Sequence, residues 1–149
     1  MRNMIVYRLS KKKYENDISG SGSIQYPGRW NMEGTQMLYT SETSSLAILE
    51  VAVHFRTILK IEQYSIIVIE VPKKYLSITK LYAEELPDKW DEYPLISETR
   101  QIGTDWVQYN KSLLLTVPSA INPYEQNILI NPNHPDFQNI KIINKQPLS

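Results

Sequence analysis

The chain contains no cysteine and only two histidines among its 149 residues. The absence of cysteine excludes disulfide bonds, thiolate metal sites and cysteine nucleophiles. Neither His54 nor His134 has a second ligand at a spacing that suits a metal, so the sequence predicts no metal site. A glycine-rich phosphate loop ending in lysine and a Gly-x-Ser-x-Gly elbow are also missing, which removes two common routes to nucleotide and acyl chemistry.

Net charge and long apolar runs are lacking as well. Lys plus Arg and Asp plus Glu number 16 each, so no overall field attracts nucleic acid or an anionic membrane. The one basic run, at positions 11–13, is typical of a solvated loop or a helix end. The apolar run near the N-terminus is too short for the core of a signal peptide, and no segment approaches the roughly 20 apolar residues that span a bilayer. We therefore expect a soluble cytoplasmic protein that binds neither a membrane nor, directly, nucleic acid.

The order of apolar and polar segments predicts one mixed α/β (α+β) domain over residues 1–149, with a strand-rich central sheet flanked by helices. The sequence predicts a helix that is capped by Ser41 or Thr43 and runs to about Leu59, and a second helix over 104–111. Residues 19–28 and most of 82–98 are typical of surface loops, the second with a short helix. Strands are expected at 5–9, 36–40, 65–71, 112–117, 127–131 and 140–143.

Glu50 is the only charged residue between Thr43 and Phe55, within a stretch that otherwise indicates a buried helix. A lone carboxylate in such surroundings costs free energy unless it is paired, hydrogen-bonded or at the mouth of a cleft. On a helical projection Glu50 falls at the margin of the apolar sector, together with Leu46 and His54. We therefore expect its side chain to point sideways into a cleft.

The other residues suited to chemistry have ordinary alternatives. Two arginines near glycine-rich loops suit a pyrophosphate, and an aromatic face suits a planar ring. Taken singly, every candidate except Glu50 fits better as a surface ion pair, a strand residue or a cap, and a simple contact between Glu50 and His54 explains that pair at least as well as catalysis. His134 is expected to stabilise a turn. The candidates are Arg8, Arg29, Tyr39, Glu50, Ser119 and Asn127.

The combination of segments resembles the RES domain family, in order and over nearly the whole chain. The family is named for an arginine, a glutamate and a serine, which match Arg29, Glu50 and Ser119 here. Two departures are a Thr104-Asp105 pair after Gly103 and the lack of a basic residue before His134. The segments that carry the resemblance are Val6-Tyr7-Arg8, Pro27-Gly28-Arg29-Trp30-Asn31, Leu38-Tyr39-Thr40-Ser41, Leu46-Ala47-Ile48-Leu49-Glu50, Ile102-Gly103-Thr104-Asp105-Trp106, Val117-Pro118-Ser119-Ala120 and Asn127-Ile128-Leu129-Ile130-Asn131-Pro132.

The resemblance implies a toxin of a bacterial toxin–antitoxin pair, with a fold similar to the ADP-ribosyltransferase toxins. It implies NAD⁺ as substrate, no metal, and cleavage of the nicotinamide–ribose bond by hydrolysis or phosphorolysis, which arrests growth. It also implies a partner antitoxin with an Xre-like helix-turn-helix that blocks the active-site cleft, and a toxin dimer within that complex.

The resemblance also implies a role for each candidate residue. Arg8 and Arg29 would hold the phosphates or the nicotinamide ribose, and Tyr39 would stack on nicotinamide. Glu50 would hold the ribose and favour an oxocarbenium-like state. Ser119 would bond to the ribose or to Glu50, with support from Asn127. Two alternatives stay open: ADP-ribose transfer to a cellular protein, and a non-enzymatic interaction domain in which Glu50 merely pairs with His54.

Overall fold

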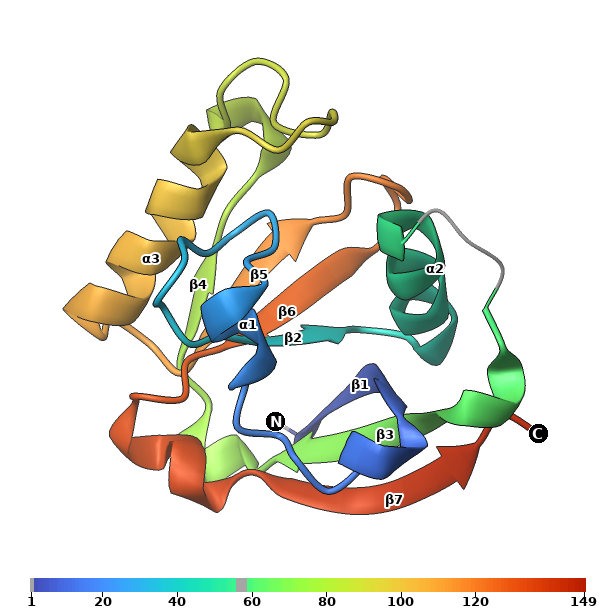
Figure 1. The fold of residues 1–149 in the computed structure, drawn as a ribbon. Coiled ribbons are helices and arrows are strands. Elements are labelled where there is room, and N and C mark those ends of the chain that lie inside the picture. Colours follow the sequence, from blue (N-terminus) through green and yellow to red (C-terminus); the bar gives the residue numbers. More distant parts are fainter. Residues whose placement is uncertain (1, 56–58) are drawn as a thin grey trace.

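A computed structural model describes residues 2–55 and 59–149 and contains one seven-stranded sheet in the order β4-β5-β6-β2-β1-β3-β7 (Figure 1). Only β4 and β5 run parallel; every other neighbouring pair is antiparallel. The strands are β1 Met4–Lys11, β2 Leu38–Ser41, β3 Tyr64–Val71, β4 Ile78–Lys80, β5 Leu114–Pro118, β6 Gln126–Ile130 and β7 Lys141–Pro147.

Three α-helices accompany the sheet: α1 Gly22–Gln25, α2 Ser44–Phe55 and α3 Ser97–Tyr109. Helix α2 contacts β1 and β2, whereas α3 contributes to a core cluster with β5 and β6. No helix within the described residues is long and apolar enough to cross a membrane. Short 3-10 turns occur at Lys12–Tyr14, Ile61–Gln63, Lys73–Tyr75, Ala83–Glu85 and Pro135–Asn139.

The sheet loosens between β1 and β2. Strand β1 pairs with β3 at eight consecutive positions but pairs with β2 at one, where Tyr7 lies opposite Ser41. Figure 1 shows β1 and β2 diverging, with α2 beside the point where they separate. This divergence matters for function because both cavities described below lie along it.

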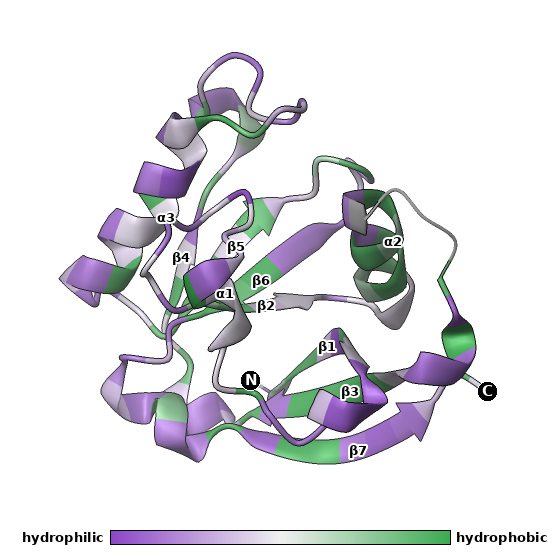
Figure 2. Cartoon of the chain, viewed as in Figure 1, coloured by the Kyte–Doolittle hydropathy of each residue, from purple (hydrophilic) through white to green (hydrophobic). Residues whose placement is uncertain are grey.

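Alternation along the strands produces two separate cores. Leu114, Ile128 and Ile130 belong to one cluster of buried residues, while their neighbours Leu115 and Leu129 belong to another. The second cluster contains Trp106 and Val107 of α3 as well as Trp30. Figure 2 shows the apolar residues along β3, the inner strands and α2, and a largely hydrophilic β7 at the sheet edge.

The structure confirms the expected fold class and all six expected strands, with boundaries shifted by at most four residues. It adds β4, a three-residue edge strand with too little alternation to be recognised. Inside the expected loop at 19–28 it adds α1, one helical turn. Thr43 caps α2 as expected, because its Oγ1 accepts from the Leu46 amide at 3.0 Å.

Both helix predictions need correction. The first helix was expected to reach Leu59 but is helical to Phe55; Leu59 is not helical, and positions 56–58 lie outside the described residues. Helix α3 begins at Ser97, seven residues before the expected start at 104. The polar residues at 97–101 hid its first turns, because they carry little apolar periodicity.

The face of α2 that is buried also differs from the face that the helical projection predicts. Leu46 is 1% exposed and lies in the buried face, not at its margin. Glu50 follows Leu46 by four residues, so it shares that inward face and points at a cavity. The expectation that Glu50 points into a cleft is confirmed, whereas the marginal position of Leu46 was wrong, because α2 is apolar on nearly every side and the direction of burial is left undetermined.

Helix α3 packs closely against the loop around Trp30, because the backbone of Gly103 lies next to the backbone of Trp30. A Cβ on Gly103 would lie 1.7 Å from the Trp30 carbonyl oxygen and 3.1 Å from its Cβ. The Thr104 hydroxyl nearby accepts from the Met32 amide at 2.9 Å, and the Arg100 Nε donates to the Gly28 carbonyl at 3.0 Å. Together these contacts set the position of the loop that carries Arg29.

We expect Gly103→Ala to lower the free energy of unfolding by about 3 kcal/mol or more, because the clash is with backbone that cannot move aside. In an unhindered helix the same change would be favourable by roughly 1 kcal/mol. Gly22→Ala is the matched control, since nothing lies within 4 Å of its added Cβ. Urea denaturation measures both; equal midpoints for the two variants would contradict the close approach.

Candidate active site

A cavity of about 260 Å³ opens beside α2, where β1 and β2 diverge. Its walls come from β1, β2, α2 and β6, and from the loops before β2, before α3 and after β5. A smaller cavity of about 90 Å³ adjoins it and shares five of its lining residues. The shared residues lie where the two cavities adjoin; they are Arg8, Tyr39, Glu50, Val51 and Asn127.

Two side chains converge on one oxygen of Glu50. The Ser119 hydroxyl donates to Oε1 at 2.8 Å, and the Asn127 amide Nδ2 donates to the same atom at 2.9 Å. The Ser119 oxygen in turn accepts from the amides of Ile121 and Asn122 at 3.1 and 3.0 Å. Those two donors leave the Ser119 proton free to point at the carboxylate. Glu50 is therefore held as an acceptor, and within the described residues both hydrogen bonds fall on Oε1 rather than Oε2.

The Asn127 amide is itself oriented by Ser41. The Ser41 hydroxyl donates to Asn127 Oδ1 at 2.7 Å, which turns the amide nitrogen toward Glu50. This contact follows from strand register, because Ser41 of β2 lies opposite Asn127 of β6. Ser41 is buried and had been considered in the sequence only as a helix cap, so its supporting role is new.

Arg8 brings a positive charge to both cavities, and among the described residues no carboxylate lies within 4 Å of its guanidinium nitrogens. One guanidinium nitrogen, Nη1, donates to the Tyr39 carbonyl at 3.0 Å, while the buried Nε has no hydrogen-bond partner. Burial lowers the pKa of Arg8, and the charge of Asp17 partly offsets this effect. A buried guanidinium with unused donors is suited to an anionic group of a ligand.

Tyr39 is fixed by its hydroxyl. The hydroxyl donates to Asn31 Oδ1 and accepts from the Trp30 amide at 3.1 Å. Gly28 packs against the phenol so closely that a Cβ there would lie 2.8 Å from the hydroxyl oxygen. Burial raises the pKa of Tyr39 well above its usual value, so the phenol stays neutral. The ring lines both cavities in a set orientation.

Arg29 lines the larger cavity but is also bonded to the loop before α3. Its Nη1 donates to the carbonyl of Trp90 and, at 3.2 Å, to that of Glu92. Its guanidinium carbon lies 5.1 Å from the centre of the Tyr93 ring. Arg29 therefore connects the cavity to the segment 82–98, which the sequence predicts to be surface loop with a short helix.

The six candidate residues are thus gathered in one place. Arg8, Arg29, Tyr39, Glu50 and Asn127 line the larger cavity, while Ser119, 3% exposed, lies behind Glu50. Sequence reasoning missed Ser41 and Tyr93; the aromatic residues around Pro94 were the one signal for the latter. His54 also lines the cavity, one turn beyond Glu50. His134 stabilises a turn as expected, since its Nδ1 accepts from the Asp136 amide at 3.1 Å.

The arrangement suits a substrate that is anionic at one point and develops positive charge at another. Glu50 can stabilise positive charge, and Arg8 can bind an acidic group. No group of three or more His, Asp or Glu side chains within residues 2–55 and 59–149 is placed to hold a metal ion.

Residues 5–149 match the RES domain family. Over 135 residues the chain is 37% identical to "Toxin Res" of Photorhabdus laumondii, which covers 90% of this chain and 85% of that protein. It is 38% identical over 133 residues to the "Prs ADP-ribosylating toxin" of a Sphingobium species, covering 87% and 82%.

The fold is similar to a chain in the crystal structure of the MbcT–MbcA toxin–antitoxin complex of M. tuberculosis. The TM-score is 0.76, and the similarity covers 96% of this chain and 82% of that one at 17% identity. At that identity the likeness concerns the fold.

The raised pKa of Tyr39 predicts a loss of stability at alkaline pH. Below about pH 10 the phenol is protonated in both folded and unfolded chains; above it, only the unfolded chain loses the proton readily. The stability that the Tyr39 phenol contributes to the folded chain therefore falls by up to about 1.4 kcal/mol per pH unit above pH 10. Urea denaturation from pH 8 to 11 should show the stability advantage of the wild type over Tyr39→Phe shrinking above pH 10. A constant difference between the two proteins would contradict the burial of a neutral phenol.

Proposed function

The chain belongs to the RES domain family, and we propose on that basis that it is the toxin of a toxin–antitoxin pair that cleaves the nicotinamide–ribose bond of NAD⁺. The observation that carries the proposal is the Glu50 carboxylate, held by Ser119 and Asn127 at a cavity that the Arg8 guanidinium also lines.

Glu50 supplies negative charge where the reaction develops positive charge. As the bond between ribose C1′ and the nicotinamide nitrogen breaks, its electron pair moves to the ring and neutralises the pyridinium. The ribose becomes oxocarbenium-like, and a fixed carboxylate stabilises it. Because Oε1 is already engaged by two donors, Oε2 is the oxygen we assign to a ribose hydroxyl.

The two arginines are assigned to the pyrophosphate. Arg8 fits this role through its buried, unused Nε donor. Arg29 has two further donor groups, Nε and Nη2, besides the Nη1 that bonds to the loop carbonyls. Tyr39 is assigned to the nicotinamide ring, because its phenol is held in place and lines both cavities together with Glu50.

The acceptor of the ADP-ribosyl group is water or phosphate in the leading version of the proposal. Either one attacks C1′ with an oxygen lone pair and releases a proton, which gives ADP-ribose or its 1″-phosphate. NAD⁺ is consumed in both cases, and its depletion is the proposed cause of growth arrest.

Transfer of ADP-ribose to a protein is a second candidate, favoured by the name of the Sphingobium relative. The same site would serve, with a side chain of the target protein as the nucleophile. Incubating lysate with adenine-labelled NAD⁺ separates the versions: a labelled protein band supports transfer, whereas soluble labelled ADP-ribose or its phosphate supports depletion.

The proposed partner is an antitoxin, since the similar solved structure is a toxin–antitoxin complex. An Xre-like helix-turn-helix in that antitoxin, and pairing of two toxins in the complex, are further parts of the proposal. Co-expression with a candidate antitoxin, followed by light scattering, measures both the contact and the stoichiometry.

We expect Glu50→Gln to slow NAD⁺ cleavage by about 100-fold or more and to abolish growth arrest, because it removes the charge from the reacting ribose. It should stay folded and lose no more than about 3 kcal/mol of stability, because the glutamine carbonyl can accept the same two hydrogen bonds without their charge. Nicotinamide release, colony formation and urea denaturation measure these three effects.

Glu33→Gln is the matched control, an exposed carboxylate outside the cavity. It should cleave NAD⁺ and arrest growth as the wild type does. Native rates of NAD⁺ loss in purified Glu50→Gln protein would overturn the assignment.

A further inference from the structure

We infer that Tyr93 forms a base-stacking subsite at the mouth of the cavity, and that it takes the adenine ring of the dinucleotide. The inference rests on the proposed function, because it names where the second half of that substrate lies. It concerns a residue outside the candidate set derived from the sequence.

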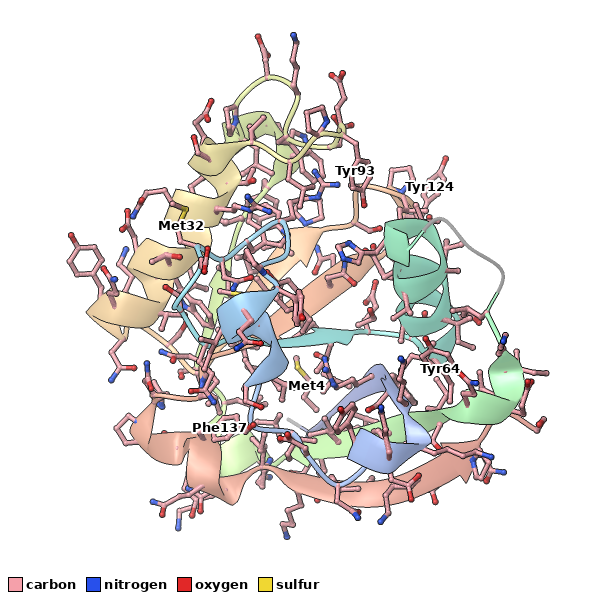
Figure 3. The ribbon with its side chains drawn as sticks, in the orientation of Figure 1. Met4, Met32, Tyr64, Tyr93, Tyr124 and Phe137 are labelled. Atoms are coloured by element: carbon pink, nitrogen blue, oxygen red, sulfur yellow. The ribbon has the colours of Figure 1, made fainter. Side chains whose placement is uncertain are left out.

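The position of Tyr93 is the first argument. Tyr93 lines the larger cavity but not the adjoining smaller one, whereas Glu50, Arg8 and Tyr39 line both. Its side chain is 38% exposed, so it stands between the cavity and solvent. His54 lines the same cavity one turn beyond Glu50, or about 6 Å along the axis of α2. In Figure 3 Tyr93 is drawn near that C-terminal end of α2.

The second argument is that contacts with the core and with Arg29 hold the loop that carries Tyr93 in place. The Trp90 ring lies 6.2 Å from the ring of Trp30, which is 3% exposed in the second core cluster. Arg29 bonds to the carbonyls of Trp90 and Glu92. A ring on such a loop is ordered before the ligand arrives, which reduces the entropy cost of stacking.

The third argument comes from size and connectivity. A cavity of about 260 Å³ is below the roughly 300–1,000 Å³ of pockets that enclose drug-sized ligands, so it covers only part of a dinucleotide. With the reacting ribose at Glu50, the pyrophosphate passes the arginines and the adenosine half must leave through the mouth. Arg29 touches the Tyr93 ring, so a phosphate on its remaining donors places the next nucleoside beside that ring.

The test compares NAD⁺ with nicotinamide mononucleotide, which has the same scissile bond but no adenosine. Tyr93→Ala should raise KM for NAD⁺ by roughly 5- to 100-fold, the range for loss of one base–aromatic stack. It should alter kcat little, and its effect on KM for the mononucleotide should be at least fivefold smaller. Tyr93→Phe keeps the ring and should restore most of the lost affinity, whereas Tyr93→Leu keeps only bulk and should not.

Tyr109→Ala is the control for loss of an exposed tyrosine, since it is 74% exposed at the end of α3 and does not line the cavity. Equal effects of Tyr93→Ala on both substrates, or no effect on either, would overturn the inference while leaving the proposed function intact. Urea denaturation excludes loss of the fold as the cause.

Calorimetric titration with AMP separates this inference from the proposed function. If the wild type cleaves neither substrate, the proposed function fails, and AMP affinity still decides the subsite. AMP binding that falls 5- to 100-fold in Tyr93→Ala supports a base subsite. Undetectable binding to the wild type, or equal binding to both proteins, rejects it.

Discussion

The site depends on the convergence of Ser119 and Asn127 on a single oxygen of Glu50. A carboxylate on an apolar helix is unfavourable unless its charge is hydrogen-bonded, and hydrogen bonds to charged groups are worth about 1.5–3 kcal/mol each. Three separate segments have to meet for this to happen: α2, the loop after β5, and β6. The pairing of β2 with β6 adds Ser41, which orients Asn127. The catalytic proposal therefore rests on sheet register as much as on the helix that carries Glu50.

Arg8 supplies the complementary constraint. Its guanidinium lines both cavities, its buried Nε has no hydrogen-bond partner within the described residues, and burial lowers its pKa. Maintaining such a group costs stability unless a ligand or a role compensates for it. Glu50 lines both cavities together with Arg8, so a negative and a positive group lie where the cavities adjoin, and Arg29 adds a second positive group to the larger one. A dinucleotide with an anionic pyrophosphate and a cationic reaction centre matches both.

The sequence predicted the strands well because alternation and β-branched runs such as 65–71 are local signals. It also singled out Glu50, since a lone charge in an apolar run is visible without a structure. The inward face of α2 was not predictable, because the helix is apolar around most of its circumference and Leu46 gave no directional signal. Ser41 and Tyr93 were missed for a different reason. Their roles depend on a cross-strand register and on the Arg29 contact, both of which join residues far apart in the chain.

The central claim is that the hydrogen-bonded Glu50 carboxylate drives cleavage of the nicotinamide–ribose bond. The most direct test is the rate of nicotinamide release from NAD⁺ by the purified chain and by Asn127→Ala, which removes one of the two donors to Oε1. The account predicts steady release by the wild type and a rate about tenfold or more lower in a folded Asn127→Ala protein. No release by the wild type, or equal rates for the two proteins, would contradict it.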